Sequence, residues 1–563
     1  MKHVAPPFID RLSRYLFPAM VVVLSGLLYL NAIGNGFVYD DNVYVESDPT
    51  IRQLGNIWKA LASTALDPNV SSAVPSNYYR PLVPITYMLD YRIFGLAPWG
   101  FHLTNILFHV LNSLLVYLIA LKLFNKRSLA LAAGLLFASH PIHTEAVAWI
   151  AIILDVGCAF FLLLAFYLYM GEDRAWVRLP LSALAFFMAL LYKETAVIFP
   201  LMLVSYEFFI RRGEKGYGLK AALTVYPAVA LAYLAVRLHV LGGFAPLPNP
   251  DAYLSGYQIL INSVYLLMRY LWMLVFPINL NAFHTLTPAL SALDPRFIAS
   301  AAAVCALFVI WMTVGKRDRF TAFAFIWVVL PLLPTMYLLK VFGGEIWNIF
   351  CERYLYLPSF GFVLFISYAG GRLHEGLSRN PRARAVVPAL FLAILFFYSA
   401  RTVLRNRVWR NNVTLYTDGL EKSPRVALLH NNMGFEHLMN GRLGEAESEF
   451  TAALRLDQKY EKAYYNLGLV YMKARDWERA RIYLETALGI KSYYADTYTN
   501  LGIVYLQLGR TDDARVSFMK ALEINPEENL ARKNLEEIYY GNETLEGSKN
   551  PRRFQNAEKM TAP

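Results

Sequence analysis

Eleven apolar runs divide the first 404 residues of this chain, and most are long enough to cross a lipid bilayer. A spanning helix needs about 20 apolar residues, because backbone N–H and C=O groups in lipid must bond within their own segment. The runs at 128–142 and 178–192 are shorter, which predicts tilted or broken helices inside a bundle. The runs cover residues 15–33, 102–124, 128–142, 149–170, 178–192, 195–210, 219–241, 297–314, 320–340, 354–372 and 386–404.

Composition indicates a chain that is part membrane protein and part soluble protein. Hydrophobic residues make up 56% of the 563 residues and charged residues 17%, too apolar for one soluble domain and too polar for a chain that only spans membrane. The net charge of +11 would suggest a nucleic-acid partner in a soluble protein. Here the excess Lys and Arg lie largely in short loops between apolar runs, where they set topology. We therefore expect no nucleic-acid partner. The three cysteines give no disulfide framework, and the first run lacks a small-residue cleavage site, so we expect it to stay as an anchor.

Clusters of basic residues occur at alternate ends of the apolar runs, and this pattern predicts which loops lie in the cytoplasm. The positive-inside rule places them in the cytoplasm together with the N-terminus. Eleven spans then put the C-terminal part outside, with exterior loops at 34–100, 242–296 and 341–353. Residues 257–276 are apolar enough to span, but counting them would break this alternation, so a juxtamembrane or re-entrant helix is predicted there. The basic clusters are Lys126-Arg127, Arg174 with Arg178, Arg211-Arg212 with Lys215, Lys316-Arg317 with Arg319, and Arg379 with Arg382 and Arg384.

A 34-residue repeat occupies the C-terminal part. Gly434, Gly468 and Gly502 keep this period, as do two sets of three alanines. The spacing is typical of the tetratricopeptide repeat, in which small residues let two antiparallel helices approach closely. We expect about three full repeats in a domain at 405–541, with a leading cap or incomplete repeat at 409–424 and a capping helix at 527–541. The polar tail 542–563 is predicted to be disordered. Such arrays present a concave surface to a peptide or protein; a rigid spacer or dimer contact is the alternative.

Asp40 and Asp41 follow the first apolar run directly. Asp favours helix caps and turns, so a solvated turn is one interpretation. The functional interpretation is a general base, because partial burial and a neighbouring like charge raise a carboxyl pKa toward neutrality. Successive residues point in different directions, so we expect one of the two carboxylates to face a substrate.

The segment Ser139–Trp149 contains His140, His143 and Glu145 between two short runs. A metal site is one interpretation, but the i, i+4 spacing of two histidines is absent and Pro141 interrupts any helix. We favour anchoring of the loop, or contact with a substrate phosphate or sugar. Asp155, inside the following run, belongs to this cluster or pairs with it. Neither a metal nor another cofactor is indicated.

Three more charged positions lie at exterior ends of runs. Lys193 and Glu194 interrupt an apolar stretch and form either a mutual ion pair or a site where Lys193 meets an anion. Arg353 either binds a lipid phosphate through two parallel guanidinium hydrogen bonds, or extends its charged end toward the membrane surface, or pairs with Glu352. Arg80 adds a further outward cation. One face that carries both carboxylates and cations suits transfer from a phosphate-linked donor.

In this order the motifs resemble the transmembrane and tetratricopeptide-repeat-containing O-mannosyltransferases and, more broadly, the GT-C glycosyltransferases. The similarity runs from about residue 15 to 540. Eukaryotic members carry longer repeat arrays, so the shorter array here points to a prokaryotic relative. The segments that carry the resemblance are Phe37-Val-Tyr-Asp-Asp, Tyr79-Arg-Pro-Leu, His140-Pro-Ile-His-Thr-Glu, Lys193-Glu and Glu352-Arg-Tyr-Leu-Tyr-Leu-Pro-Ser.

The resemblance implies a GT-C-like all-α membrane bundle at 1–404 and an enzyme that moves a sugar from a polyprenyl-phosphate donor to an acceptor hydroxyl, normally a protein Ser or Thr, on the exterior face. By similarity to the related protein O-mannosyltransferases, Asp40 is the base and Asp41 orients or tunes it. Lys193, Glu194, Arg353 and Arg80, with the His140 segment, would contact the donor. The implied partners are the lipid-linked donor, membrane lipid and an acceptor protein that reaches the repeats.

Two other classes of function compete with this one. A membrane scaffold would use its repeats for protein assembly and would tolerate Asn at position 40. A transporter or flippase is disfavoured because the charges gather on one face instead of near the midplane. The predicted location is a prokaryotic inner membrane, with the repeats on the periplasmic side.

Overall fold

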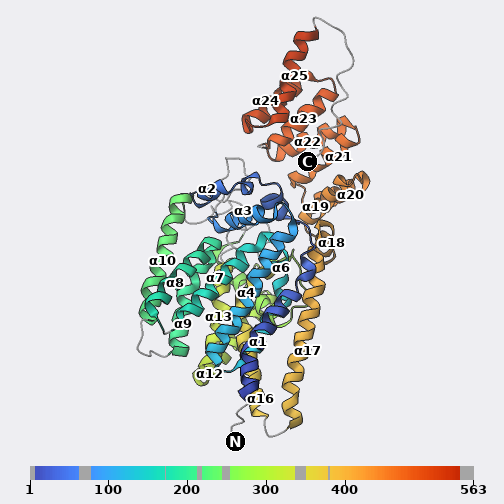
Figure 1. Cartoon of the computed structure of the whole chain (residues 1–563). Helices are drawn as coiled ribbons and strands as arrows, with labels where there is room; N and C mark the ends of the chain where they lie inside the picture. The colour runs from blue at the N-terminus through green and yellow to red at the C-terminus, as the bar shows by residue number, and fades with distance from the viewer. Residues whose placement is uncertain are drawn as a thin grey trace. The chain divides into compact units, whose positions relative to one another are not determined.

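The computed structural model describes residues 7–62, 78–171, 173–211, 218–243, 254–336, 350–377, 381–492 and 494–545, and every regular element in these ranges is helical. The chain forms two compact units, Met1–Ser423 and Pro424–Pro563. Figure 1 shows the elements of each unit with their labels. The basic residues Lys215 and Arg379 and the tail beyond residue 545 lie outside the described ranges.

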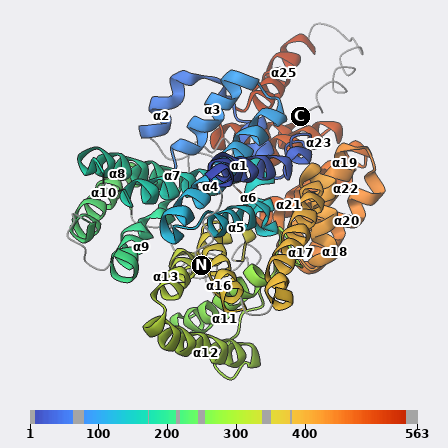
Figure 2. The ribbon, with the colours of Figure 1, turned by 60° about the horizontal axis from the view of Figure 1, so that its bottom comes forward.

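The first unit is a bundle of long helices, as predicted. Figure 2, along the bundle, shows α4 and α5 near its centre, with α8, α9 and α10 on one side and α11, α12 and α13 on another. The helices are α1 (Pro7–Leu27), α4 (Pro98–Phe124), α5 (Arg127–Ser139), α7 (Ile153–Tyr169), α8 (Ala175–Tyr192), α9 (Phe199–Tyr206), α10 (Gly218–Leu241), α11 (Gly256–Val275), α12 (Pro295–Arg317), α13 (Arg319–Val329), α14 (Leu333–Met336), α16 (Pro358–Gly376) and α17 (Pro381–Asn406).

Nine helical stretches in the described residues are long and apolar enough to cross a membrane, against the predicted eleven runs. Three predicted runs fall outside the nine: α5 and α9 are too short, and the second half of α16 is polar. The nine stretches also include the segment predicted at 257–276, because α11 is an uninterrupted apolar helix of 20 residues. Its continuity argues against the re-entrant interpretation, and the juxtamembrane alternative stays a prediction. The prediction of a short helix inside the bundle is confirmed for 128–142 by α5, whose C-terminal half is buried. It is wrong for 178–192, because α8 has 18 residues and is long enough to span.

The two ends of the bundle differ in chemistry. At one end, Lys126 contacts Glu375 (Nζ–Oε1 2.5 Å) and Arg127 contacts Ser13 (3.2 Å), which brings the predicted cytoplasmic segments together. At the other end lie α2 (Ile57–Ala62), α3 (Leu82–Phe94), α6 (Thr144–Ala148) and short 3-10 turns. The candidate site residues are all found at this second end.

Close packing of α13 against α16 fixes the segment that precedes α16. A Cβ on Gly361 would lie 2.6 Å from the Ala324 carbonyl oxygen, so only glycine allows this approach. Phe166, Trp327 and Phe360 fill the space beside it, with ring centroids of Trp327 4.4 Å from Phe166 and 5.0 Å from Phe360. The turn at 352–355, which carries Arg353, is thereby held at the end of the bundle.

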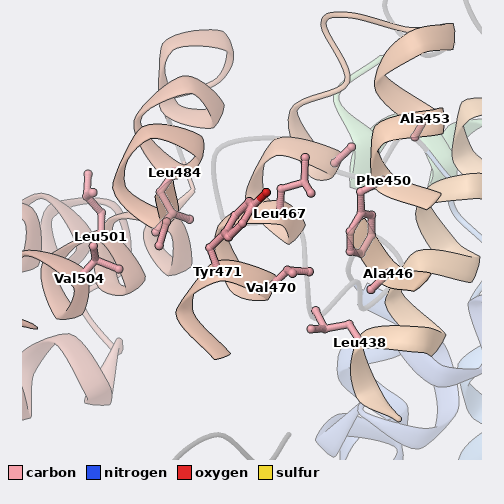
Figure 3. Packing of buried hydrophobic residues seen from close by; sticks show 12 residues of the cluster. Leu438, Ala446, Phe450, Ala453, Leu467, Val470, Tyr471, Leu484, Leu501 and Val504 are labelled. Carbon is pink, nitrogen blue, oxygen red and sulfur yellow. The ribbon is translucent and has the colours of Figure 1, made fainter. Parts of the chain in front are cut away.

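The second unit consists of three helix pairs and a final helix, which confirms the tetratricopeptide-repeat prediction. Figure 3 shows its core, where Phe450, Leu467, Tyr471 and Leu484 lie between successive helices. The predicted leading cap differs: helix α18 (Asn412–Lys422) groups with the membrane unit. The repeat helices are α19 (Ala427–Met439), α20 (Leu443–Leu456), α21 (Glu461–Lys473), α22 (Trp477–Ile490), α23 (Ala495–Gln507), α24 (Thr511–Ile524) and α25 (Asn529–Leu545).

Replacing Gly468 by Ala should destabilise the repeat unit. The added Cβ would lie 2.7 Å from Leu484 side-chain atoms, so the two helices of the repeat must separate. We expect a loss of about 1–3 kcal/mol in unfolding free energy. Gly489→Ala is the matched control, because a Cβ there meets no atom within 4 Å. Thermal unfolding of the full chain in detergent distinguishes the two; equal stability of both variants would contradict the packing role.

Candidate active site

The two adjacent aspartates have different environments. Asp41 is fully buried, and its carboxylate accepts from the N–H groups of Val38 (3.1 Å) and Ala151 (2.7 Å). Burial raises the pKa of Asp41, while these two N–H groups oppose the rise. Asp40 is half-buried and begins the same helical turn, directly after Tyr39, whose φ of 51° is in the left-handed region. Asp41 therefore ties this loop to the start of the 150–152 turn, and Asp40 is the more accessible carboxylate.

Arg353 pairs with Glu145, so the alternative of a pair with its neighbour Glu352 is wrong. Its Nη1 lies 2.5 Å from Glu145 Oε1, and its backbone N–H donates to Glu145 Oε2 (3.0 Å). Glu145 is almost completely buried and the Arg353 side chain is 14% exposed. Burial raises the pKa of Glu145, and the Arg353 guanidinium acts in the opposite direction. The guanidinium also lies over the rings of Trp149 and Tyr354.

Lys193 and Glu194 do not pair with each other, although they are adjacent. Lys193 Nζ lies 2.5 Å from Asp155 Oδ1, with both side chains less than 10% exposed. Glu194 accepts two bonds from Arg80, Nε–Oε2 2.9 Å and Nη2–Oε1 2.6 Å. Asp155 therefore pairs with Lys193 and not with the cluster of His140, His143 and Glu145, which corrects the prediction for this residue. The backbone is extended at Lys193, which turns the two side chains toward different helices.

His140 and His143 are fully buried and hold the loop that carries Glu145. His140 Nε2 lies 3.1 Å from the Leu274 carbonyl oxygen, and His143 Nε2 lies 2.8 Å from Ser359 Oγ. Burial lowers the pKa of both imidazoles, that of His140 to about 4. This position favours the anchoring interpretation over contact with a substrate. In the described residues, no group of three or more His, Cys, Asp or Glu side chains is placed to share a metal ion.

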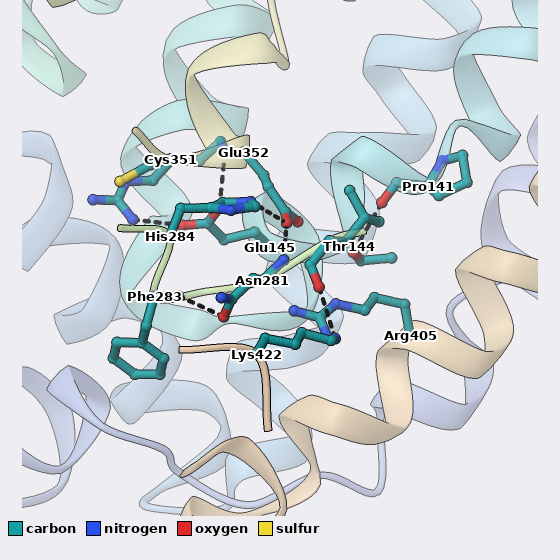
Figure 4. A network of polar contacts seen from close by, with 12 residues as sticks. Pro141, Thr144, Glu145, Asn281, Phe283, His284, Cys351, Glu352, Arg405 and Lys422 are labelled. Carbon is teal, nitrogen blue, oxygen red and sulfur yellow. Dashed lines mark hydrogen bonds and ion pairs between the residues drawn. The ribbon is translucent and has the colours of Figure 1, made fainter. Parts of the chain in front are cut away.

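A polar network behind Glu145 holds the 281–284 segment, as Figure 4 shows. Glu352, the neighbour of Arg353, is 1% exposed and accepts from His284 Nε2 (3.2 Å) and from the backbone N–H of Asn281. The Asn281 side chain donates to Ser423 Oγ (2.8 Å). The backbone of Phe283 is therefore fixed close to Arg353, a feature that the sequence motifs did not indicate.

Two hollows meet at Arg353. One, which we call the cationic hollow, takes in about 430 Å³ of empty space, and the other, which we call the aromatic hollow, about 250 Å³; both volumes include open solvent. The cationic hollow is lined by Asp155, Cys158, Ala159, Lys193, Thr195, Pro331, Thr335, Arg353, Tyr354, Tyr356, Leu357 and Pro358. The aromatic hollow is lined by Tyr39, Trp149, Ala282, Phe283, Arg353, Trp409 and Leu415.

The arrangement combines groups that suit phosphate chemistry with a carboxylate. Lys193 and Arg353 line the cationic hollow, and Asp40 follows Tyr39 of the aromatic hollow. Of the residues named from the sequence, these three and Asp155 lie at or beside the hollows. Glu145 pairs with Arg353, and the Arg80–Glu194 pair holds the segment after Lys193. Tyr354 and the aromatic wall were missed as site residues, although Trp149 and Tyr354 stand inside the quoted motifs.

Replacing Glu194 by Gln should remove a pH-dependent part of the stability. Although burial alone would raise it, the Arg80 guanidinium lowers the pKa of Glu194 to about 2. A lowered carboxyl pKa stabilises the fold above the unfolded value, about 4.3, and this contribution is lost as pH falls toward 2. The wild type should therefore exceed Glu194→Gln by about 1–3 kcal/mol at neutral pH, with the difference shrinking below about pH 4.3. Thermal unfolding of both proteins from pH 7 to pH 3 measures it; a pH-independent difference would refute the ion pair.

Two family models match this chain. The one described as dolichyl-phosphate-mannose-protein mannosyltransferase matches residues 78–240, and a tetratricopeptide-repeat model matches residues 459–527. The first match includes Arg80, Glu145 and Lys193 and lies between Asp40 and Arg353. The mannosyltransferase match therefore contains both partners of the Arg80–Glu194 and Lys193–Asp155 ion pairs, and one partner of the Arg353–Glu145 pair.

The curated relatives that match this chain are named as protein O-mannosyl-transferases. A protein O-mannosyl-transferase of Caenorhabditis elegans is 26% identical over 451 residues, 79% of this chain and 63% of that protein. Protein O-mannosyl-transferase TMTC1 of Homo sapiens is 27% identical over 502 residues, 80% of this chain and 56% of that protein. This chain thus spans about three fifths of the length of these relatives. Among solved structures, the archaeal oligosaccharyltransferase AglB from Archaeoglobus fulgidus matches with a TM-score of 0.44 and 13% identity, over 70% of this chain and 56% of AglB.

The fold and the matches define a multi-pass membrane protein with a helical bundle, part of which matches a mannosyltransferase family model, and a tetratricopeptide-repeat unit. Its homologues are the protein O-mannosyl-transferases of the TMTC type, at 25–27% identity over about four fifths of the chain. The resemblance drawn from the sequence motifs is therefore confirmed. The prokaryotic origin stays a prediction.

Proposed function

We propose that this protein transfers a mannosyl group from a polyprenyl-phosphate donor to a hydroxyl of an acceptor protein, with Asp40 as the general base. The observation that carries the proposal is the position of Arg353 between the two hollows. It joins a cationic hollow, suited to a phosphate, to an aromatic hollow that begins at the residue before Asp40. The names of the matching family and relatives support the choice of mannose and of a protein acceptor.

The donor phosphate would lie between Lys193 and Arg353. Both cations are nearly buried and are each neutralised by one carboxylate, Asp155 and Glu145. An isolated cation would be costly to bury, so these carboxylates keep the cations in place before the donor binds. The wall formed by Pro331, Leu357 and Pro358 is apolar, as the first units of a prenyl chain require.

Transfer would then proceed by direct displacement at the sugar. The acceptor oxygen attacks C1 of the mannosyl group while Asp40 takes the hydroxyl proton. The bond between C1 and the phosphate oxygen breaks, and its electron pair stays on the phosphate, so the products are the mannosylated protein and polyprenyl phosphate. Negative charge grows on the phosphate in this step, where Lys193 and Arg353 stabilise it. A prenyl phosphate leaves without a proton donor, which agrees with a single accessible carboxylate.

The test is consumption of the donor by membranes that contain the protein. We expect such membranes to consume polyprenyl-phosphate mannose in preference to polyprenyl-phosphate glucose and to release polyprenyl phosphate. Control membranes contain Asp40→Asn at equal abundance. Equal consumption by both membranes would support the alternative function, a scaffold that uses its repeats for protein assembly.

The acceptor would reach the site from the exterior side, with the repeats on that side. Lys59→Cys and Lys473→Cys should therefore react with an impermeant thiol reagent in intact cells, whereas Lys316→Cys should react only after permeabilisation. All three positions are exposed in the structure. The three native cysteines are first replaced by Ser or Ala. Labelling of position 316 in intact cells, or protection of position 59, would reverse the proposed orientation.

A further inference from the structure

We infer that the aromatic hollow is the subsite for the pyranosyl ring of the donor. This rests on the proposed function, because it assigns the sugar of a donor whose phosphate lies in the cationic hollow. The sugar C1 must stand between the phosphate and the attacking hydroxyl. The aromatic hollow suits this position, because Arg353 lines both hollows and Tyr39, the residue before Asp40, lines the aromatic one.

The walls of the aromatic hollow have the chemistry that a sugar ring requires. Trp149 and Trp409 stack with ring centroids 5.3 Å apart and planes inclined by 19°, and Tyr39 lies 5.8 Å from Trp149 and 5.7 Å from Phe283. The C–H groups on one face of a pyranose carry partial positive charge and pack on the electron-rich faces of such rings. A purely apolar ligand would also pack on these rings. The polar groups of the hollow therefore decide between an apolar ligand and a sugar.

Two donors in the hollow favour a ligand with oxygen atoms. Trp409 is 1% exposed, and its buried Nε1–H has no hydrogen-bond partner among the residues that the structure describes. A buried donor without a partner is costly, and a ligand hydroxyl would satisfy it. Among the residues that line the aromatic hollow, Arg353 is the charged one. Its guanidinium donates to Glu145 through Nη1. Sugar hydroxyls can accept from both groups while the C–H face packs on the rings.

The hollow is also built to keep its shape. The backbone N–H of Tyr39 donates to Asn412 Oδ1 (2.8 Å), and that of Phe283 donates to Asn281 Oδ1 (3.0 Å). In Figure 4 the ring of Phe283 points away from the polar network that holds its backbone. These two bonds fix the backbone positions of Tyr39 and Phe283 at the hollow.

The experiment compares two ligands, polyprenyl-phosphate mannose and sugarless polyprenyl phosphate, on the purified full-length protein. Trp409→Phe removes the unpartnered N–H, and Phe283→Leu removes one ring. We expect each variant to weaken binding of the mannosyl donor about 3- to 10-fold and to bind the sugarless phosphate as the wild type does. Matched controls are Trp272→Phe and Phe276→Leu, whose side chains are 63% and 45% exposed and which should change neither affinity.

Each other outcome overturns the inference. Equal weakening of both ligands, or no change for either, would show that the hollow does not hold the sugar. A change confined to the KM of the acceptor would assign the hollow to the acceptor instead. Failure of the wild type to bind either ligand would refute the proposed function, and the inference with it. Thermal unfolding of each variant shows whether lost binding reflects lost folded protein.

Discussion

Asp40→Asn should abolish most mannosyl transfer while leaving donor binding intact. Asparagine keeps the shape of the side chain but cannot take the proton of the acceptor hydroxyl. A positioned general base contributes about 10²–10⁴-fold to the rate, and we expect a loss in this range in kcat. Because Asp40 is half-buried and lies outside the long helices, the unfolding temperature should change little. Single-turnover transfer with pre-bound donor separates this loss from a loss of binding.

Asp41→Asn is the matched control at the adjacent residue, and it should fail in a different way. Its two carboxylate oxygens accept from Val38 and Ala151 at buried positions. An amide would turn its NH2 group toward one of these donors, which should cost about 1–3 kcal/mol of stability. We expect a lower unfolding temperature and reduced activity in proportion to the folded fraction. If folded Asp41→Asn were inactive and Asp40→Asn active, the base would be the other aspartate; if both were active, the mechanism would be wrong.

The order of the helices was predictable because it depends on local patterns. Apolar runs and basic clusters locate α4, α7 and α10 to within a few residues, since length and charge decide where a helix can lie in lipid. The 34-residue period predicted the repeats for the same reason, because each repeat contacts mainly its neighbours. The predicted count of spans was wrong because α5 and α9, which are too short to span, were counted, and because the polar second half of α16 was not considered.

The pairing of charges was not predictable from adjacency. Lys193 pairs with Asp155, 38 residues earlier, and Arg353 with Glu145, 208 residues earlier. Sequence order indicated Glu194 and Glu352 as partners, but a backbone turn directs neighbouring side chains to different helices. Trp409 and Phe283 gave no signal because aromatic residues are frequent in this chain, and only the fold brings them to Arg353.

Replacing the Glu145–Arg353 pair by neutral residues should leave a folded protein that hardly uses its donor. Arg353→Met alone leaves Glu145 buried without its partner, which typically costs about 3–5 kcal/mol. The double variant Glu145→Gln with Arg353→Met removes both charges, so most of this stability should return. Turnover should not return, because the cation at the phosphate is gone; loss of one such group costs about 10²–10³-fold in kcat. Arg353→Lys should be impaired as well, since one ammonium cannot reproduce the planar fork.

The matched control is the Arg405–Asp418 pair, which is buried to a similar extent (2.6 Å, 4% and 16% exposed) and lines neither hollow. Arg405→Met with Asp418→Asn should change donor turnover less than about threefold, which corresponds to a change of less than about 1 kcal/mol in activation free energy. Unfolding temperature and transfer rate, measured on the same preparations, separate the two roles of a buried ion pair. Wild-type turnover by the folded Glu145→Gln, Arg353→Met protein would remove Arg353 from the phosphate site. Loss of turnover in both double variants would show that any buried pair at this end of the bundle matters only for the fold.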